Sequence, residues 1–299
     1  MNNNFKAYLM LLLGTIFWAG NFIVGKLAFI EDIPPFSLVF FRWLTVWFIL
    51  LPFTYKEISK NKNDIFNSLP LLLFLGLMSI GLFNSFVYIS LQYTQVINAS
   101  LFNTAIPAAI ILFCFIFKLE KTNFFQLLGL LVSVFGILFI ITRADLNILL
   151  SLNFNVGDLW MIGAVICWGL YSAFLKKLKL KVSLLTFVHL VCSCGLLFSF
   201  PQFIYEYTQG DIINVDKTFL YCILYLALFP SIGSYYCWVG AVSIIGANRA
   251  GIFLSLIPLW STAMAIFFFD EIFQLYHAIG SILVVLGLFL ANKKHKEAS

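Results

Sequence analysis

Charged side chains are scarce in this chain of 299 residues, because only 10% of its residues are Asp, Glu, Lys or Arg. Roughly a quarter of the residues in an average soluble domain are charged, so this composition excludes a water-soluble globular protein. The sequence also lacks a phosphate-binding P-loop, a zinc motif, a Ser-His-Asp arrangement and a dinucleotide-binding loop. We therefore expect no ATPase motif, no metal site, no cofactor and no enzymatic activity.

The positions of the cysteines do not indicate a metal site, and the positions of the basic residues do not indicate nucleic-acid binding. All 6 cysteines fall within apolar segments without histidine partners at ligand spacing, so we expect reduced, buried thiols. The net charge is +5, but the basic residues stand in short runs between apolar blocks. This distribution is typical of membrane topology. The expected partners are membrane lipid and a small molecule, and not nucleic acid.

Apolar residues are abundant instead, at 62% of the chain, and 35 of them are phenylalanine. A helix needs about 20 residues to cross a hydrocarbon core of ~30 Å. This length predicts an all-α membrane protein with ten spans, over residues 7–29, 35–55, 69–89, 97–117, 122–142, 157–175, 183–205, 217–241, 247–268 and 274–292.

Lysine and arginine predict how these spans are oriented, since short cytoplasmic loops are enriched in both residues. With the N-terminus inside, 14 of the 18 basic residues fall in inside segments, whereas the outside segments hold only Arg143 and Lys217. Such a division requires an even number of spans. It therefore favours ten spans over nine or eleven, with both termini in the cytoplasm.

The second half of the chain repeats the first at an offset of about 151 residues. Pro107, Glu120, Gly129 and Gly136 match Pro258, Glu271, Gly280 and Gly287 without a gap, and Trp18 matches Trp168 at an offset of 150. We expect five-helix repeats over 1–146 and 147–299. An odd number of spans in each half inverts the second repeat relative to the first. Inverted repeats of this kind are typical of secondary transporters.

These motifs resemble the EamA family of the drug/metabolite transporter superfamily, and the resemblance covers nearly the whole chain. It consists of a Trp-plus-small motif in the first span of each half, a proline in the fourth, then Glu, then Gly-x6-Gly in the fifth. The resemblance implies ten helices, cytoplasmic termini, a substrate cavity between the halves, and export or exchange of amino acids or similar metabolites. It departs at Arg249, whose counterpart is Asn98.

Two basic residues fall inside expected spans, where a charge is costly and often functional. Lys26 could bind an anion, or it could snorkel toward the nearby interface. Arg42 lies deeper and could grip a carboxylate or phosphate with two hydrogen bonds, or make structural contacts to carbonyls. No Asp or Glu falls in the middle of an expected span, which argues against proton coupling through a buried carboxylate.

Polar and aromatic residues within the spans could line a cavity for a small organic molecule. Alternatively, the polar residues could join helices and the aromatic residues could form interfacial belts. Trp18 and Asn21 share a helix face, as do Trp168 and Tyr171, and these repeat-related pairs are expected to face each other. The predicted substrate-binding set is Trp18, Asn21, Lys26, Arg42, Asn84, Tyr88, Asn103, Trp168, Tyr171, Tyr235, Ser255 and Trp260.

Two prolines and two glutamates recur at matching positions of the two halves and are expected to shape the helices. Pro107 and Pro258 lie mid-span and could act as hinges, because proline removes a backbone hydrogen bond. Glu120 and Glu271 are expected to cap the fifth span of their half or to stabilise its turn. The four repeat-related glycines are expected to allow close helix packing.

The function predicted from these observations is secondary transport of amino acids or related metabolites across a bacterial inner membrane by alternating access. The basic residues favour a zwitterionic or carboxylate-bearing substrate. A larger metabolite such as S-adenosylmethionine, or a drug-like cation, is the alternative, because aromatic walls can hold a cation. A channel or a membrane enzyme is a more distant alternative, since the inverted repeat favours neither.

Overall fold

The computed structural model describes residues 3–119, 124–151, 154–175, 177–211, 213–245 and 252–291. Within these ranges every regular element is a helix. The elements are α1 Asn3–Ile30, α2 Pro35–Lys60, α3 Lys62–Asn67, α4 Leu69–Gly76, η1 Leu77–Asn84, α5 Ser85–Tyr93, α6 Val96–Phe102, η2 Asn103–Ala105, α7 Ile106–Ile116, α8 Phe124–Ile141, α9 Leu146–Ser151, α10 Val156–Leu175, α11 Leu184–Thr208, α12 Lys217–Leu226, η3 Ala227–Gly233, α13 Ser234–Ile245, η4 Ile252–Ser255, α15 Leu256–Phe269 and α16 Leu275–Ala291.

Eight helical segments of the described chain are long and apolar enough to cross a membrane. Leu256–Phe269 and Leu275–Gly287 are shorter apolar helices. Each of the segments expected from the sequence overlaps one observed helix or one run of consecutive helices. The structure therefore has the helical, multi-pass character that the apolar runs predict.

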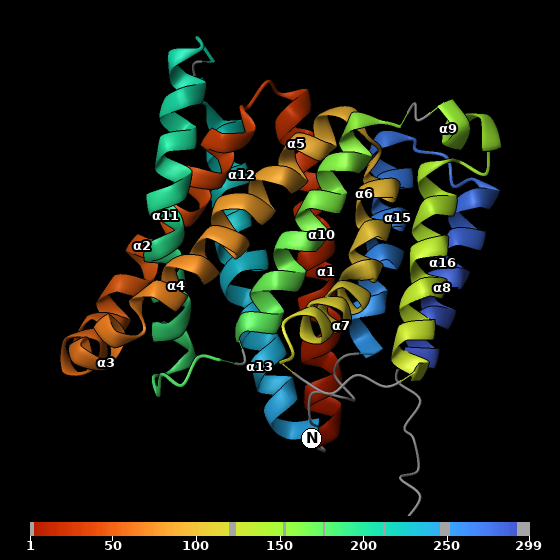
Figure 1. The fold of residues 1–299 in the computed structure, drawn as a ribbon. Coiled ribbons are helices and arrows are strands. Elements are labelled where there is room, and N and C mark those ends of the chain that lie inside the picture. The colour runs from red at the N-terminus through yellow and green to blue at the C-terminus, as the bar shows by residue number, and fades with distance from the viewer. Residues whose placement is uncertain are drawn as a thin grey trace, which may run out of the picture.

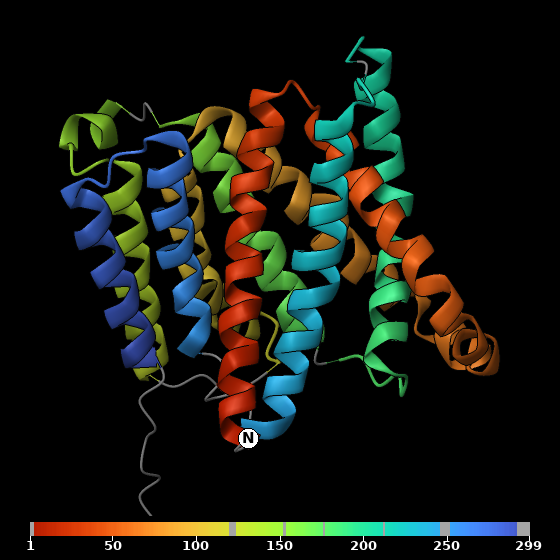
Figure 2. The same ribbon diagram turned by 180° about the vertical axis from the view of Figure 1, so that it is seen from behind.

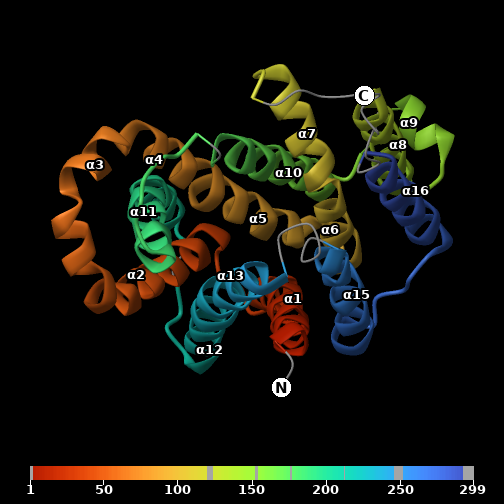
Figure 3. The same ribbon diagram turned by 90° about the horizontal axis from the view of Figure 1, so that it is seen from below.

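The helices run between two ends of one bundle, as Figure 1 and the view from behind in Figure 2 show. We call the end where α1 begins the lower end and the end where α1 finishes the upper end. α16 finishes at the lower end, the same end at which α1 begins (Figure 1). Seen from below, α8 and α16 form one edge of the bundle and α2 and α11 lie at the opposite side (Figure 3).

The α8–α16 edge is held by direct contact between helix backbones. A methyl group added at Gly136 would lie 2.7 Å from the carbonyl oxygen of Gly280, and one at Gly287 would lie 2.5 Å from that of Gly129. These four are the repeat-related glycines of the sequence, and they meet as two pairs, Gly136 with Gly280 and Gly287 with Gly129. The prediction that they allow close packing is confirmed, since any side chain there would force the helices apart.

The helices α2 and α11 are joined at both ends by glutamate caps. At the upper end, Glu206 of α11 accepts hydrogen bonds from the backbone N–H groups of Phe36 and Ser37, at 3.0 and 2.6 Å, and from the Ser37 hydroxyl at 2.7 Å. At the lower end, Glu57 of α2 accepts from the N–H of Ser183 at 2.8 Å and also from the hydroxyls of Ser183 and Thr186. Each carboxylate satisfies donors at the start of the other helix, where the helix dipole favours an anion.

These two caps differ in burial, which gives a stability prediction. Glu206 is 5% exposed, whereas Glu57 is partly exposed and Ser183 is exposed. We expect Glu206→Ala to lower the free energy of unfolding by about 1–3 kcal/mol, because it leaves buried donors without an acceptor. Thermal unfolding in detergent measures the change. Glu57→Ala is the matched control and is expected to have the smaller effect, because water can replace its carboxylate. Equal melting temperatures for both variants would contradict this account.

Two transmembrane segments contain wide π-helical turns at corresponding positions, η1 in the first half and η3 in the second. Side chains bond the carbonyl groups that the wider turn frees. Asn84 donates to the Ser79 carbonyl at 2.7 Å, and Ser231 donates to the Leu226 carbonyl at 2.8 Å. Such π turns are rare and occur frequently at functional sites. Both turns lie halfway along their segments, so a functional site is expected near the middle of the bundle.

The predicted hinge prolines follow a short 3-10 turn in each half. Pro107 is the second residue of α7, directly after η2, and Pro258 is the third residue of α15, directly after η4. Proline is tolerated in the first turn of a helix because its missing N–H has no partner there anyway. The prolines therefore start new helical segments, and hinge motion at them stays a prediction.

Glu271 caps a different helix from the one expected. Its two carboxylate oxygens accept hydrogen bonds from the backbone N–H groups of Val96 and Ile97, at 2.7 and 2.9 Å, which start α6 in the other half. The expectation that it caps the following helix of its own half is wrong for this residue. Its repeat counterpart Glu120 lies outside the described residues.

Candidate functional site

A buried arginine lies at the centre of the bundle, surrounded by neutral oxygen atoms. Arg42 of α2 is 4% exposed. Its Nη1 donates to Asn21 Oδ1 at 2.7 Å, to Asn84 Oδ1 at 3.0 Å and to the Tyr88 hydroxyl at 2.6 Å, and its Nε donates to the Ser231 hydroxyl at 2.8 Å. We call these five residues the Arg42 cluster.

The Arg42 cluster draws on elements of both halves of the chain. Asn84 ends the π-helical turn η1 and Ser231 lies within η3, so both wide turns present a side chain to the same guanidinium group. Asn21 also accepts a hydrogen bond from Tyr88 at 3.0 Å, which fixes the two residues against each other. Nη2 of Arg42 makes no hydrogen bond to the described residues and is the open donor of the group. All four partners are neutral, so the positive charge is not compensated within the cluster.

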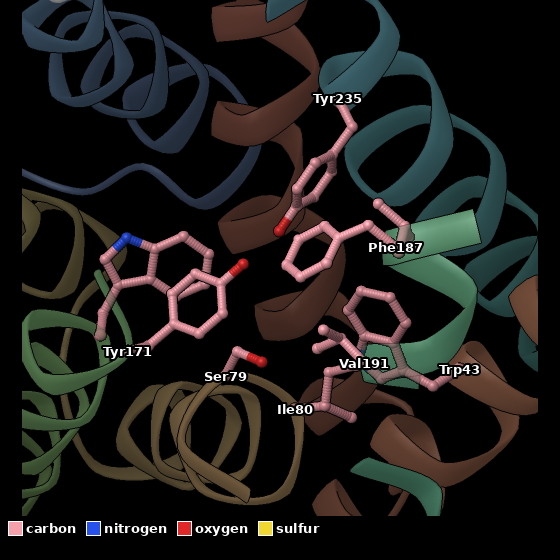
Figure 4. Close-up of a pocket in the computed structure, with 9 residues that line it drawn as sticks. Trp43, Ser79, Ile80, Tyr171, Phe187, Val191 and Tyr235 are labelled. Carbon is pink, nitrogen blue, oxygen red and sulfur yellow. The ribbon is translucent and has the colours of Figure 1, made fainter. Parts of the chain in front are cut away.

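A small cavity of about 20 Å³ lies beside the Arg42 cluster. The hydroxyl groups of Ser79, Tyr171 and Tyr235 point toward a common space, and Phe187 lies next to Tyr235 (Figure 4). Every side chain around it is aromatic, aliphatic or a hydroxyl, namely Trp43, Ser79, Ile80, Trp168, Tyr171, Phe187, Val188, Val191 and Tyr235. A cavity of this size holds on the order of one water molecule.

A second cavity of about 320 Å³ lies toward the lower end, between α2, α11 and the η3–α13 segment. It is lined in part by Ser183 and Leu184 at the lower end of α11, and it shares Val188 and Tyr235 with the first cavity. Its volume reaches the lower limit of known small-molecule sites, which is about 300 Å³. We call the two together the central cavity. Tyr235 and Val188 separate its narrow upper part from its wide lower part.

Most of the residues predicted for the site meet around this centre. Asn21, Arg42, Asn84 and Tyr88 belong to the Arg42 cluster, and Trp168, Tyr171 and Tyr235 line the cavity. Trp18 packs against Tyr235 and Trp238, at ring-centroid distances of 6.3 and 6.0 Å. Tyr235 therefore lies between Trp18 of the first half and Tyr171 of the second half.

Other predicted residues lie apart from this centre. The Lys26 ammonium group donates to the carbonyl groups of Leu91 and Thr94, at 2.8 and 3.3 Å, and so caps the upper end of α5. Asn103 in η2 and Trp260 in α15 do not line the cavity, although each holds a buried polar atom that has no hydrogen-bond partner in the described part of the chain. Ser255 ends η4, but its side chain lies outside the described residues.

The sequence did not point to several residues of this centre. Trp43 follows Arg42 directly and lines the cavity, and the guanidinium carbon lies 5.0 Å from its ring. Ser231 and Ser79 lie in or beside the π-helical turns, where regular helix spacing fails to predict which face a residue occupies. Phe187 and Val191 are four apart on α11, a spacing that predicts a shared face but no particular role.

The helices and this centre define a multi-pass helical membrane protein with an arginine-centred polar cluster beside an aromatic cavity. The model of the EamA-like transporter family matches the sequence twice, over residues 5–142 and 155–293. The chain belongs to the EamA-like transporter family.

Similar proteins agree with this membership. An uncharacterized transporter of Archaeoglobus fulgidus is 26% identical over 299 residues, covering 98% of this chain and 100% of that protein. A probable amino-acid metabolite efflux pump of Escherichia coli is 24% identical over 300 residues, covering 95% of this chain and 94% of that protein. A crystal structure with 14% identity covers 96% of both chains with a TM-score of 0.58, which shows a similar fold.

Proposed function

We propose that this protein is a secondary transporter of small carboxylate-bearing metabolites, amino acids or their relatives, by alternating access. The carboxylate contacts Arg42 and the remainder of the substrate occupies the central cavity. The observation that carries this proposal is a buried guanidinium group whose partners are all neutral and whose Nη2 is open. A carboxylate would compensate the charge and can accept two parallel hydrogen bonds from such a group.

The lining of the central cavity supports this choice of substrate. Its side chains are aromatic, aliphatic or neutral and polar, and no acidic residue is among them. An ammonium group would therefore lack a carboxylate partner there. We infer that a metabolite with a carboxylate and an apolar or aromatic body binds better than an amine with the same body. The description of the Escherichia coli relative as an amino-acid metabolite efflux pump is consistent with such a substrate.

We further propose that the chain forms ten spans in two inverted repeats, 1–146 and 147–299, in a bacterial inner membrane with cytoplasmic termini. The two family matches support the repeats. Further support comes from features that recur in each half: the π-helical turns, the 3-10 turns before proline and the glutamate caps of α2 and α11. The lower end is then the cytoplasmic end.

The alternative substrates fit the centre less well. A drug-like cation, or the sulfonium of S-adenosylmethionine, would bring a second positive charge near Arg42. Aromatic rings can attract a cation, but here the guanidinium charge opposes it. A channel or a membrane enzyme is not favoured by any feature of the described residues.

A matched set of three compounds tests the substrate class. 3-Phenylpropionate carries only the carboxylate, phenylalanine carries both charged groups, and phenethylamine carries only the ammonium. We expect thermal stabilisation of the purified protein by 3-phenylpropionate and phenylalanine but not by phenethylamine, since a ligand that binds the folded state raises its apparent stability. Counterflow in proteoliposomes with labelled phenylalanine then tests transport. Stabilisation by phenethylamine alone would contradict the proposal.

A further inference from the structure

A fully buried carboxyl group lies at the upper end of the bundle, away from the Arg42 cluster. Asp158 in the first turn of α10 is 0% exposed. Its Oδ1 accepts a hydrogen bond from the Thr94 hydroxyl at 2.7 Å, whereas its Oδ2 is buried and has no hydrogen-bond partner among the described residues. An ionised carboxylate can accept about four hydrogen bonds, and burying one with a single neutral donor is costly.

A chain of hydrogen bonds leads from His277 of α16 to this carboxyl. His277 Nδ1 accepts from the N–H of Gln274 at 2.9 Å, so the ring proton lies on Nε2, which donates to Asn98 Oδ1 at 2.7 Å. Asn98 Nδ2 donates to the Thr94 hydroxyl at 3.4 Å, and Thr94 donates to Asp158. Every donor in this chain is directed toward Asp158, which is its final acceptor.

The other ionisable groups around this chain already use their polar atoms in contacts. Nδ1 of His277 accepts a hydrogen bond from Gln274, so a second ring proton would break that bond. Glu271 uses both oxygens to accept backbone N–H groups, and Lys26 of α1 donates to two carbonyl groups of α5. The ring of Tyr276 is tilted against that of His277 with their centroids 4.1 Å apart, and the exposed Arg143 after α8 acts on Asp158 only through its charge. Among the described carboxyl and imidazole groups in and around this chain of hydrogen bonds, Asp158 is the one with a buried polar atom left without a contact.

We propose that Asp158 is the site at which this transporter binds its coupling proton. The sequence predicted no such group, because Asp158 lies at the edge of a span rather than in its middle. The inference rests on the proposed function.

The backbones of α5 and α10 touch beside Asp158, since a methyl group on Gly157 would lie 2.7 Å from the Ser90 carbonyl oxygen. This contact joins the two halves at the upper end of the bundle (Figure 1). The wide part of the central cavity lies toward the opposite, lower end. Alternating access requires the contact to open, and opening would let water reach the carboxyl and take its proton.

Infrared spectroscopy of the purified protein tests proton binding without any substrate. We expect the absorption band of a protonated, buried carboxyl to appear as the pH of the wild-type protein is lowered, and we expect this band to be absent in Asp158→Asn. Asp145→Asn, which alters an exposed aspartate, is the control and should retain the band. Thr94→Val removes the donor to Oδ1 and should make the band persist to higher pH, because the ionised form loses its hydrogen bond. A wild-type protein without the band, or an Asp158→Asn variant that keeps it, overturns the assignment.

Calorimetry in two buffers of different ionisation enthalpy tests the coupling. We expect binding of 3-phenylpropionate to transfer protons in the wild type and to lose that transfer in Asp158→Asn, with melting temperatures verifying that the variant is folded. Equal proton transfer in both proteins overturns the coupling. Stabilisation of the wild type by sodium, lost in Asp158→Asn, would assign the site to that ion and overturn the proton. If 3-phenylpropionate does not bind, the proposed substrate class fails, and the infrared result alone decides the proton site.

Discussion

Replacing Arg42 by glutamine is expected to weaken binding of 3-phenylpropionate by about tenfold to a hundredfold. A hydrogen bond to a charged group contributes about 1.5–3 kcal/mol, and each 1.4 kcal/mol is a factor of about ten in affinity. Glutamine removes the charge, and its amide nitrogen takes the place of the arginine Nε, which donates to Ser231. Arg42→Lys restores the charge without the planar pair of donors, so we expect an intermediate affinity. Calorimetric titration of the three proteins measures the series.

Lys26 provides the matched control for this prediction, because it is the other basic residue inside an expected span. Its ammonium group caps α5 at the upper end, so Lys26→Gln is expected to leave the affinity for 3-phenylpropionate unchanged, even where it lowers the melting temperature. If Arg42→Gln, verified as folded by gel filtration, binds as well as the wild type, then Arg42 is only a structural residue. A loss of affinity in Lys26→Gln alone would move the anion site to the upper end.

A methyl group at Gly136 is expected to destabilise the bundle strongly. It would lie 2.7 Å from the Gly280 carbonyl oxygen and 2.8 Å from the backbone nitrogen of Val284, and neither atom belongs to a side chain that can rotate away. Overpacking of this kind costs about 1–3 kcal/mol. We expect Gly136→Ala to lower the melting temperature in detergent accordingly, and Gly136→Leu to leave little folded protein in gel filtration.

Gly14→Ala is the control for this second prediction. Gly14 also lies within a helix, but the nearest atom to an added methyl group is the side-chain Cβ of Cys237 at 3.3 Å. Alanine favours a helix over glycine by up to about 1 kcal/mol, which offsets the modest crowding. The prediction fails if Gly136→Ala is as stable as Gly14→Ala. That result would mean that α8 and α16 can separate without loss.

The helical segments could be predicted from the sequence because long apolar runs have few alternatives in lipid. The close contacts of the four glycines could be predicted because these glycines recur at matching positions of the two halves. Arg42 could be predicted as a site residue because a charge inside a span is costly. The same argument could not show that Arg42 lies at the candidate site and that Lys26 does not. Both are cations within apolar helices, and only the three-dimensional structure places the carbonyl groups of α5 beside the lysine.

The residues that complete the centre were harder to predict, for two physical reasons. A π-helical turn adds a residue to the helix, so Ser231 reaches Arg42 from a position that regular helix spacing assigns to another face. The exposed fraction of a residue at the end of a helix depends on which other helices cover that end, and the sequence does not show this. Asp158 looks interfacial in the sequence but is enclosed by the upper ends of other helices.

The glutamate caps of α2 and α11 offer a way to tell one state of the transport cycle from the other. In this structure the Glu206 cap is buried and the Glu57 cap is partly exposed, on the side where the wide part of the central cavity lies. Inverted repeats can exchange conformations, so in the inverted-repeat arrangement that we propose the opposite state would bury Glu57 and expose Glu206. Solvent accessibility of the two carboxylates would then change in opposite directions as the cycle turns. The pair forms a built-in indicator of which side of the membrane the cavity faces.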